Sequence, residues 1–417
     1  MSGFFGKFLF GDADAGRLEL PGYQKALDNL FYSSSDKSQE CQVNRARICV
    51  AQNGSGLPEV YEDSDSGGVC ILHGEIFNFD ELYQSIGDSR HSGEQSVNNA
   101  ERFYSFLTAS DRAKLDMVNG VFCAVVVTPS GHLHIVSDRW NVIPVYYYRS
   151  ANGIIFSSEF TSLCHLSEVP RRLSHKGLFQ YFALGRLLTG VTLFEDVHST
   201  SPATVISFGQ DGESKTRYWT PQFGYACEKI GIRAERITNA ILESARIKSL
   251  DQDRFGYASL LSGGLDSRVT AKAVSSFCPH VVAYTVTDFE NYEYKMAKRV
   301  AETLGITHKW MRRDLDYWAD HILKSVRIAD GNRPFYGCVL LDVVGTIEEE
   351  VVFDGCGFDF TFQGQSLFLP TKYPITLMGK NLFGQRLDRP SSREDVYNKA
   401  WSFLHKMRFD FISGLGF

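Results

Sequence analysis

The stretch Leu260-Leu261-Ser262-Gly263-Gly264-Leu265-Asp266-Ser267-Arg268 decides the fold of the second half of the chain. It follows an apolar run of strand type, 257–261, and opens a helical pattern that begins near Asp266. Two adjacent glycines let the backbone turn tightly and approach a ligand without a Cβ clash. The N–H groups of the loop and the positive end of the helix dipole then face an anion. The stretch therefore predicts a phosphate-binding loop between a strand and a helix.

The polar side chains of this loop fit a phosphate that is accompanied by a divalent cation. Ser262 and Ser267 add hydroxyl donors. Asp266 would repel a phosphate unless a cation lay between them, and a carboxylate oxygen is a ligand that Mg²⁺ accepts. The structural alternative is a glycine-rich turn in which Asp266 is the N-cap of the helix.

The elements around the loop alternate between strands and helices. Apolar residues recur at spacings of three and four in two segments, which predicts two amphipathic helices. Apolar runs at 281–286 and 351–353 predict further buried strands. Alternating strands and helices are typical of an α/β domain with a doubly wound parallel sheet, and we assign it residues 221–417. The residues that mark the two helices are Ala234, Ile237, Ile241 and Ala245, and Tyr294, Ala297, Ala301 and Leu304.

The first half of the chain has a different pattern, with short strands separated by turns. Residues 120–127 and 132–136 flank the turn Pro129-Ser130-Gly131, which predicts a hairpin. Strand-like runs follow at 142–148 and 153–157, and helical segments such as 100–107 are fewer. We therefore predict an α+β domain built on antiparallel sheets over residues 1–220.

Composition excludes several classes of protein. The 417 residues include 43 Lys and Arg against 49 Asp and Glu, a net charge of −6, which removes the electrostatic argument for a nucleic-acid partner. No apolar run approaches the roughly 18 to 20 residues that cross a bilayer, and the start lacks the pattern of a signal peptide. We expect a cytoplasmic protein without a membrane partner. The nine cysteines form no CxxC pair, which fits reduced thiols.

The loop resembles the pyrophosphate loop of the ATP pyrophosphatases, and the wider chain is similar to the asparagine synthetase family, which includes β-lactam synthetase and the lasso-peptide cyclases. The resemblance implies a class II glutamine amidotransferase domain of Ntn-hydrolase fold, a sandwich of sheets, followed by an ATP pyrophosphatase (PP-loop) domain. The second domain would adenylate a carboxylate, and an amine would attack the adenylate to form an amide, releasing AMP and pyrophosphate. Outside the loop, the resemblance rests on the segments Met1–Gly6, His73–Asn78, Asn119–Phe122, Ser137–Arg139, Pro144–Tyr147 and Phe156–Glu159.

The resemblance also implies a set of site residues for ATP and Mg²⁺. Asp266 and Asp359 would hold Mg²⁺. Glu293 matches an acidic residue at the start of the helix after the second strand, although an acidic residue favoured by the helix dipole is an equal interpretation. The residues that would hold pyrophosphate are Ser262, Gly263, Gly264, Leu265, Asp266 and Ser267, and those that would line the nucleotide are Leu260, Val286, Asp354 and Gly355.

Cys356 departs from the family pattern at the position between Gly355 and Gly357. Asparagine synthetases carry Glu there, and β-lactam synthetase carries Tyr as part of its base. A thiol acts as an acid or base near neutral pH only if its pKa is lowered. Catalytic work by Cys356 and simple lining of the pocket are therefore both open.

The amino terminus departs from the family in a way that affects the source of the amine. Glutamine-using members have a nucleophilic Cys after the initiator Met, whereas this chain has Ser2, whose alkoxide forms far less readily than a thiolate. His73 replaces an Asn of the glutamine-binding strand. We therefore expect a degenerate, glutaminase-inactive domain and an ATP-dependent ligase that acts by cyclisation or ligation. The alternatives are an asparagine synthetase that uses ammonia or glutamine, and a non-catalytic nucleotide-binding scaffold.

The end of the chain bears on partners. Family members carry an essential lysine well downstream of the loop that contains Asp359, and no lysine here has a matching context. The apolar segment 409–417 predicts contact with a partner surface, from a homodimer or another subunit. The substrate is expected to be a small molecule or peptide with a carboxylate and an amine. The lysines in the remaining stretch are Lys372, Lys380, Lys399 and Lys406.

Overall fold

The fold was analysed in a computed structural model, which describes most of the chain as far as residue 358. The described residues are 2–11, 18–31, 36–43, 45–52, 57–86, 98–109, 112–188, 190–210, 212–222, 228–249, 255–314, 316–330, 340–341, 346–358, 376–377 and 380–381.

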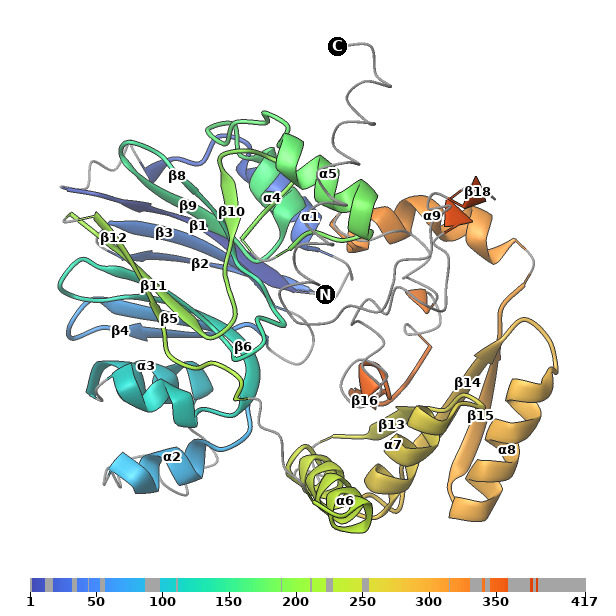
Figure 1. The fold of residues 1–417 in the computed structure, drawn as a ribbon. Coiled ribbons are helices and arrows are strands. Elements are labelled where there is room, and N and C mark those ends of the chain that lie inside the picture. Colours follow the sequence, from blue (N-terminus) through green and yellow to red (C-terminus); the bar gives the residue numbers. More distant parts are fainter. Residues whose placement is uncertain are drawn as a thin grey trace. The chain divides into compact units, whose positions relative to one another are not determined.

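Two antiparallel six-stranded sheets form the first part of the described chain, and Figure 1 shows them facing each other. The first sheet has the order β10 (Val197–Ser199), β8 (Tyr146–Arg149), β9 (Gly153–Ser157), β1 (Gly3–Leu9), β3 (Ala46–Gln52) and β2 (Lys37–Val43). The second has the order β12 (Gly212–Arg217), β11 (Thr204–Gly209), β7 (Leu133–Ser137), β6 (Gly120–Val127), β5 (Gly68–Ile76) and β4 (Glu59–Asp63).

The core between the two sheets arises from the period of two along each strand. Successive side chains of a strand point to opposite faces, so a strand covered on both sides is apolar throughout. In β1, Phe4 and Phe8 join the cluster between the sheets, whereas Phe5 joins a second cluster on the outer face. In β5, Val69 and Ile71 face inward. Each such buried side chain contributes about 1.5–3 kcal/mol.

Helices cover the outer faces of both sheets and complete a four-layer α+β sandwich (Figure 1). The outer cluster of the first sheet includes residues of α1 (Tyr23–Leu30) and α4 (Phe160–His165), and that of the second includes residues of α2 (Phe79–Ile86) and α3 (Asn99–Ala109). Two further helices of the described residues are a 3₁₀ helix (Arg112–Met117) and α5 (His175–Leu184). The predicted sandwich of antiparallel sheets is confirmed, as are the hairpin of β6 with β7 and the helix at 100–107.

A separate parallel sheet carries the second half of the chain. Its order is β15 (Thr307–Arg312), β14 (Val282–Thr287), β13 (Tyr257–Leu260) and β16 (Val351–Phe353). The helices are α6 (Ile230–Ile247), α7 (Leu265–Ser275) and α8 (Tyr292–Leu304). From β13 the chain winds outward through β14 to β15 and then returns to the other side of β13 as β16. The predicted doubly wound α/β sheet is confirmed, and its strand order reverses between β13 and β16.

The helical periodicity predicts the buried face of α8 but not that of α6. Ala297 and Ala301 of α8 are buried, and both lie in the hydrophobic cluster of the parallel sheet. In α6, however, only Ala245 of the predicted apolar stripe is buried, since most of this helix is exposed. A short pair of strands, β17 (Thr376–Leu377) and β18 (Lys380–Asn381), completes the described elements.

Contacts divide the chain into two compact units, and each unit consists of two separate segments of the sequence. One unit comprises residues 1–227 and 318–341, and the other comprises 228–317 and 342–417. Helix α9 (Tyr317–Ile328), which follows β15 in sequence, thus belongs almost entirely to the unit of the antiparallel sandwich. The boundary between residues 220 and 221 stays a prediction. Among the helices in the described ranges, none is both long and apolar enough to cross a membrane.

Candidate functional site

The predicted phosphate loop connects β13 to α7 at the carboxyl edge of the parallel sheet. Leu261 continues the ladder beyond β13, because its N–H donates to the carbonyl of Tyr284 at 2.8 Å. Gly264 is the N-cap residue of α7 and has no side chain to accept from the first-turn N–H groups. Those groups lack intrahelical partners, so the first turn offers donors to an anion.

The two serines of the loop hold its shape. The hydroxyl of Ser267 lies 2.9 Å from that of Ser262 and accepts from the backbone N–H of Ser262 at 3.1 Å. The Ser262 hydroxyl accepts in turn from the N–H of Gly264 at 3.1 Å. Ser267 is buried, with 8% of its surface exposed. These bonds explain what fixes the shape of the loop, and the role of the hydroxyls as phosphate donors stays a prediction.

A second loop, after β16, packs directly against the start of α7. A Cβ atom on Gly355 would lie 2.9 Å from the carbonyl carbon of Asp266 and 2.9 Å from the backbone nitrogen of Ser267. Glycine is therefore required for this approach. Asp354 shapes the same loop, because its Oδ1 accepts from the N–H of Cys356 at 2.8 Å. The contact brings together Asp266 and Gly355, which the sequence analysis placed at one site.

The first turn of α8 forms the other wall of the phosphate loop. A Cβ atom on Gly263 would lie 3.1 Å from the Cα of Glu293, which is an exposed residue. Val286 precedes the last residue of β14, the strand next to β13. The structure thus gathers Glu293, Val286 and the phosphate loop along one edge, where ligands of open α/β sheets bind.

The metal prediction for Asp266 and Asp359 stays a prediction, and the structure describes carboxylates near the first of these two residues. Asp266 is half-buried on the first turn of α7, and the loop next to it carries the exposed Asp354. Mg²⁺ bound with a nucleotide typically takes one or two carboxylates together with phosphate oxygens, so this donor set fits. No group of three or more His, Cys, Asp or Glu suited to a metal occurs within the described part of the chain.

Several predicted residues fall outside the described residues. These include Asp359 and three of the lysines considered for catalysis, Lys372, Lys399 and Lys406. Lys380 begins the strand β18. The apolar end at 409–417 is also outside. Cys356 is exposed and, like the other cysteines of the described chain, carries a free thiol.

The residues around Ser2 at the amino terminus, which we call the amino-terminal centre, are buried and hydrogen-bonded to one another. Ser2 is 4% exposed. The N–H of Phe4 donates to the hydroxyl of Ser158 at 2.9 Å, and the hydroxyl of Ser157 donates to the carbonyl of Phe4 at 3.1 Å. A side chain on Gly3 would overlap the Ser158 hydroxyl. The start of β1 is therefore tightly packed against the end of β9.

Two titratable side chains near this centre, His73 and Glu159, favour their uncharged forms around neutral pH. Burial lowers the pKa of His73 to about 4, and its Nδ1 has no hydrogen-bond partner among the described residues. Burial, followed by the nearby Asp330, raises the pKa of Glu159 to about 9. A neutral imidazole and a protonated carboxyl provide little charge to hold the ionic groups of an amino-acid ligand.

Asp330 is a residue of this region that sequence reasoning did not find. Its carboxylate accepts from the N–H of Phe160 and, at 3.0 Å, from the N–H of Thr161. It therefore caps α4, whose own N-cap residue, Glu159, makes no capping bond. No local signal marks this role, because the cap and the helix are 170 residues apart in the chain.

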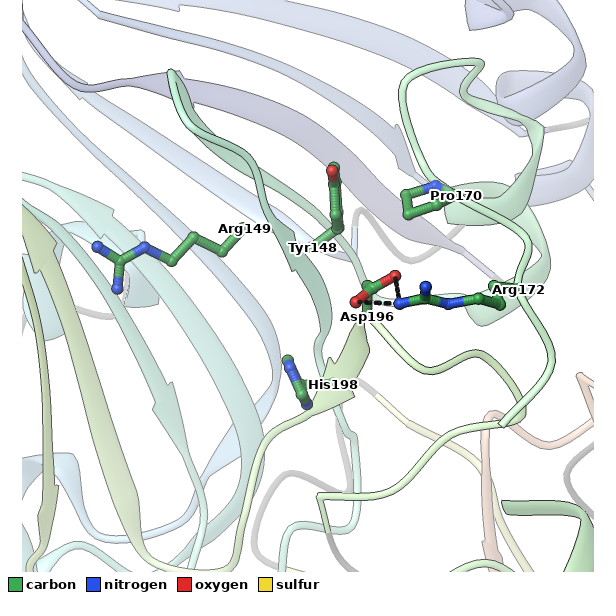
Figure 2. Close-up of a pocket in the computed structure, with 6 residues that line it drawn as sticks. All are labelled: Tyr148, Arg149, Pro170, Arg172, Asp196 and His198. Carbon is green, nitrogen blue, oxygen red and sulfur yellow. Dashed lines mark hydrogen bonds and ion pairs between the residues drawn. The ribbon is translucent and has the colours of Figure 1, made fainter. Parts of the chain in front are cut away.

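A surface depression of about 480 Å³ lies elsewhere in the sandwich unit, and none of the predicted site residues line it. Figure 2 shows that Arg172 points toward Asp196, and the two form an ion pair at 3.2 Å. Arg149 pairs with Glu213 at 3.3 Å. Both arginines that line the depression are thus paired with carboxylates, which makes the depression a poor anion site. The lining residues are Tyr148, Arg149, Pro170, Arg172, Asp196 and His198.

The fold and the site define a class of protein, an amidotransferase-type sandwich joined to a nucleotide-binding domain of the PP-loop type. Residues 35–219 match the family profile of the glutamine amidotransferase domain, and residues 240–406 match that of asparagine synthase. The two profiles thus match most of the chain in succession, and its first domain has the Ntn-type amidotransferase fold.

Curated relatives agree with this assignment. Asparagine synthetase [glutamine-hydrolyzing] 3 of Bacillus subtilis is 25% identical over 288 residues, which are 62% of this chain and 45% of the relative. Asparagine synthetase [glutamine-hydrolyzing] of Asparagus officinalis is 23% identical, over 64% of this chain and 42% of the relative. The chain thus spans less than half the length of these relatives. The solved glutamine phosphoribosylpyrophosphate amidotransferase of B. subtilis, complexed with ADP and GMP, has 12% identity and a TM-score of 0.34, covering 74% of this chain and 65% of that chain.

Proposed function

We propose that the protein is an ATP- and Mg²⁺-dependent ligase that adenylates a substrate carboxylate and couples it to an amine. The products are an amide, AMP and pyrophosphate. The observation that carries the proposal is the approach of the Gly355 loop to the first turn of α7, beside a glycine-rich loop at the strand-order reversal. This arrangement leaves uncapped N–H donors and the Asp266 carboxylate at one edge of the parallel sheet, as a bound nucleoside triphosphate requires.

The residues of the site would divide the work between binding and charge compensation. The first-turn N–H groups of α7 would bind the leaving pyrophosphate, because the helix dipole favours negative charge there. Asp266 would hold Mg²⁺, which supplies Lewis-acid stabilisation of phosphoryl oxygens. Leu260 and Val286, at the ends of neighbouring strands, would contact the nucleoside.

The amino-terminal domain is proposed to lack glutaminase activity. Ser2 is a weak nucleophile compared with a cysteine, and the neutral His73 and protonated Glu159 provide little charge for a zwitterionic substrate. The amine would then come from free ammonia or from a substrate, so intramolecular cyclisation or ligation is proposed. Glutamine-dependent ammonia release that disappears in Ser2→Ala would contradict this part of the proposal.

Carboxylate-dependent exchange of labelled pyrophosphate into ATP tests the main proposal. The exchange reports reversible adenylation, and it needs no knowledge of the amine. Aspartate, other amino acids and short peptides with free carboxylates would be compared, and Asp266→Ala should abolish any exchange. Binding of ATP without exchange for any carboxylate would instead support the non-catalytic scaffold.

Asparagine synthesis is the second candidate, because the similar curated proteins carry that name. It predicts that aspartate supports exchange and that aspartate with ammonia yields asparagine and AMP. Exchange with a peptide or another amino acid, but not with aspartate, would favour cyclisation or ligation.

A further inference from the structure

Arg268 is a cation whose side chain bonds to the phosphate loop itself. Its Nε donates to the carbonyl oxygen of Gly264 at 3.1 Å. Arg268 lies four residues after Gly264, in the first turn of α7, and helical side chains point back toward the helix N-terminus. The guanidinium group is thus held beside Gly264, the last residue of the loop before α7, and Arg268 is only half-buried.

The bond to Gly264 uses one of the five N–H groups of the guanidinium. The four N–H groups on Nη1 and Nη2 form the planar fork that matches two oxygens of a phosphate. No carboxylate of the described residues lies within ion-pair distance of Arg268. The fixed Nε also limits how much side-chain freedom would be lost on binding an anion.

The charges around the loop make a cation at this place useful. Asp266, Glu293 and Asp354 bring carboxylates to the same edge of the sheet, and a nucleoside triphosphate adds further negative charge. Loop N–H groups and one divalent cation offset part of this charge. A guanidinium within reach of the loop offsets more, at the point where the pyrophosphate would lie.

We propose that Arg268 binds the β- and γ-phosphoryl oxygens of ATP and stabilises the departing pyrophosphate. The chemical part of this proposal rests on the proposed function, whereas the binding part does not. A carboxylate oxygen attacks the α-phosphorus, and the bond from that phosphorus to the bridging oxygen breaks. The electron pair stays on the pyrophosphate oxygen, and Arg268 donates hydrogen bonds to the charge that forms there.

The rival interpretation is that Arg268 only fixes the loop through its bond to Gly264. The two interpretations differ in which ligands they affect. A loop that has lost its shape binds every nucleotide poorly, whereas a lost phosphate contact affects only ligands that carry the β- and γ-phosphates. AMP, which lacks both, therefore separates the two.

The test measures the affinities of inorganic pyrophosphate, ATP and AMP for the full chain by calorimetry with Mg²⁺ present. Arg268→Gln keeps a side-chain donor and removes the charge. Arg312→Gln is the matched control, because the Nε of Arg312 also donates to a backbone carbonyl, that of Asp288, at 3.1 Å. Arg312 ends β15, two strands from β13.

We expect Arg268→Gln to weaken pyrophosphate and ATP by about 10- to 100-fold, the loss typical of a charged hydrogen bond. AMP binding should stay unchanged, and Arg312→Gln should stay within about twofold of wild type for all three ligands. Arg268→Lys should recover part of the affinity, since it restores the charge without the fork.

Three results would overturn the inference. They are equal losses in Arg268→Gln and Arg312→Gln, an AMP loss as large as the pyrophosphate loss, and no binding of pyrophosphate by the wild-type chain. Failure of the ligase proposal would be visible separately, as pyrophosphate binding that depends on Arg268 together with no carboxylate-dependent exchange.

Discussion

The amino-terminal centre and the phosphate loop use their polar groups in opposite ways. Around Ser2, the backbone of Phe4 is bonded by Ser157 and Ser158, and the nearby His73 and Glu159 are uncharged near neutral pH. At the phosphate loop, the serines bond only within the loop, and the first-turn N–H groups of α7 are left uncapped.

The difference shows how the pairing of polar groups distinguishes a binding site from a structural region. A buried polar group without a partner costs free energy, so a region that serves only structure pairs most of its polar groups, although the Nδ1 of His73 has no partner among the described residues. A region that binds an anion keeps donors unpaired, and it can do so because it is exposed to water. Gly264 and Leu265 are exposed, whereas Ser2 is buried. The comparison therefore favours the second domain as the place of chemistry.

Among the substitutions at the phosphate loop, Gly355→Ala should reduce the affinity for ATP most strongly. The new methyl group would lie 2.9 Å from backbone atoms of Asp266 and Ser267, which cannot move without disturbing α7. Overpacking of this kind costs about 1–3 kcal/mol, which corresponds to roughly 5- to 150-fold in affinity if the loop is displaced. Calorimetric titration with ATP and Mg²⁺ measures the loss.

Gly231→Ala is the matched control for that substitution. Gly231 lies in the first turn of α6, and no heavy atom would lie within 4 Å of the new Cβ. Alanine in a helix is favoured over glycine by up to about 1 kcal/mol, so this variant should melt at the same temperature or higher and keep its ATP affinity. Unchanged ATP affinity in Gly355→Ala would show that the second loop is not part of the nucleotide site.

Replacing Asp330 by asparagine should lower the stability of the unit that contains the amino-terminal centre, by a smaller amount. Asparagine tolerates the positive φ of 54° at this position, so the change removes charge with little backbone strain. We expect a loss of about 1 kcal/mol, because the carboxylate that accepts from two N–H groups of α4 is removed, and a decrease in melting temperature of a few degrees. Thermal unfolding followed by circular dichroism measures it.

The control for Asp330→Asn is Asp65→Asn, a change of the same type at an exposed residue of the same unit. Its effect should lie within about 0.5 kcal/mol of zero. Equal melting temperatures for the two variants would mean that the carboxylate of Asp330 does not stabilise α4.

The two regions also differ in how much their sequence reveals. The phosphate loop was predictable because strand, paired glycines and helix are contiguous from Tyr257 to Ser275, so local preferences alone indicate it. The contact of Gly355 with Asp266 depends on where β16 joins the sheet, and an aspartate–glycine pair is common in turns. The cap from Asp330 depends on a pairing across 170 residues, which no local pattern encodes. The stripe of α6 was predicted correctly as helical, but periodicity does not indicate how much of a face is covered.

Replacing Glu159 by glutamine should have an effect that is small near pH 5 and grows as the pH rises. The pKa of Glu159 is about 9 in the folded chain and near 4.5 for an ordinary glutamate, because burial and the nearby Asp330 disfavour its charged form. Between these values the folded state retains a proton that the unfolded state releases, so the free energy of unfolding falls as pH rises through this window. Glutamine has the shape of the protonated side chain and does not titrate. The melting temperature of Glu159→Gln, measured by scanning fluorimetry, should therefore match wild type near pH 5 and exceed it increasingly toward pH 9. Parallel curves for the two proteins would mean that Glu159 is ionised and solvated, and that the amino-terminal centre is more open than its packing indicates.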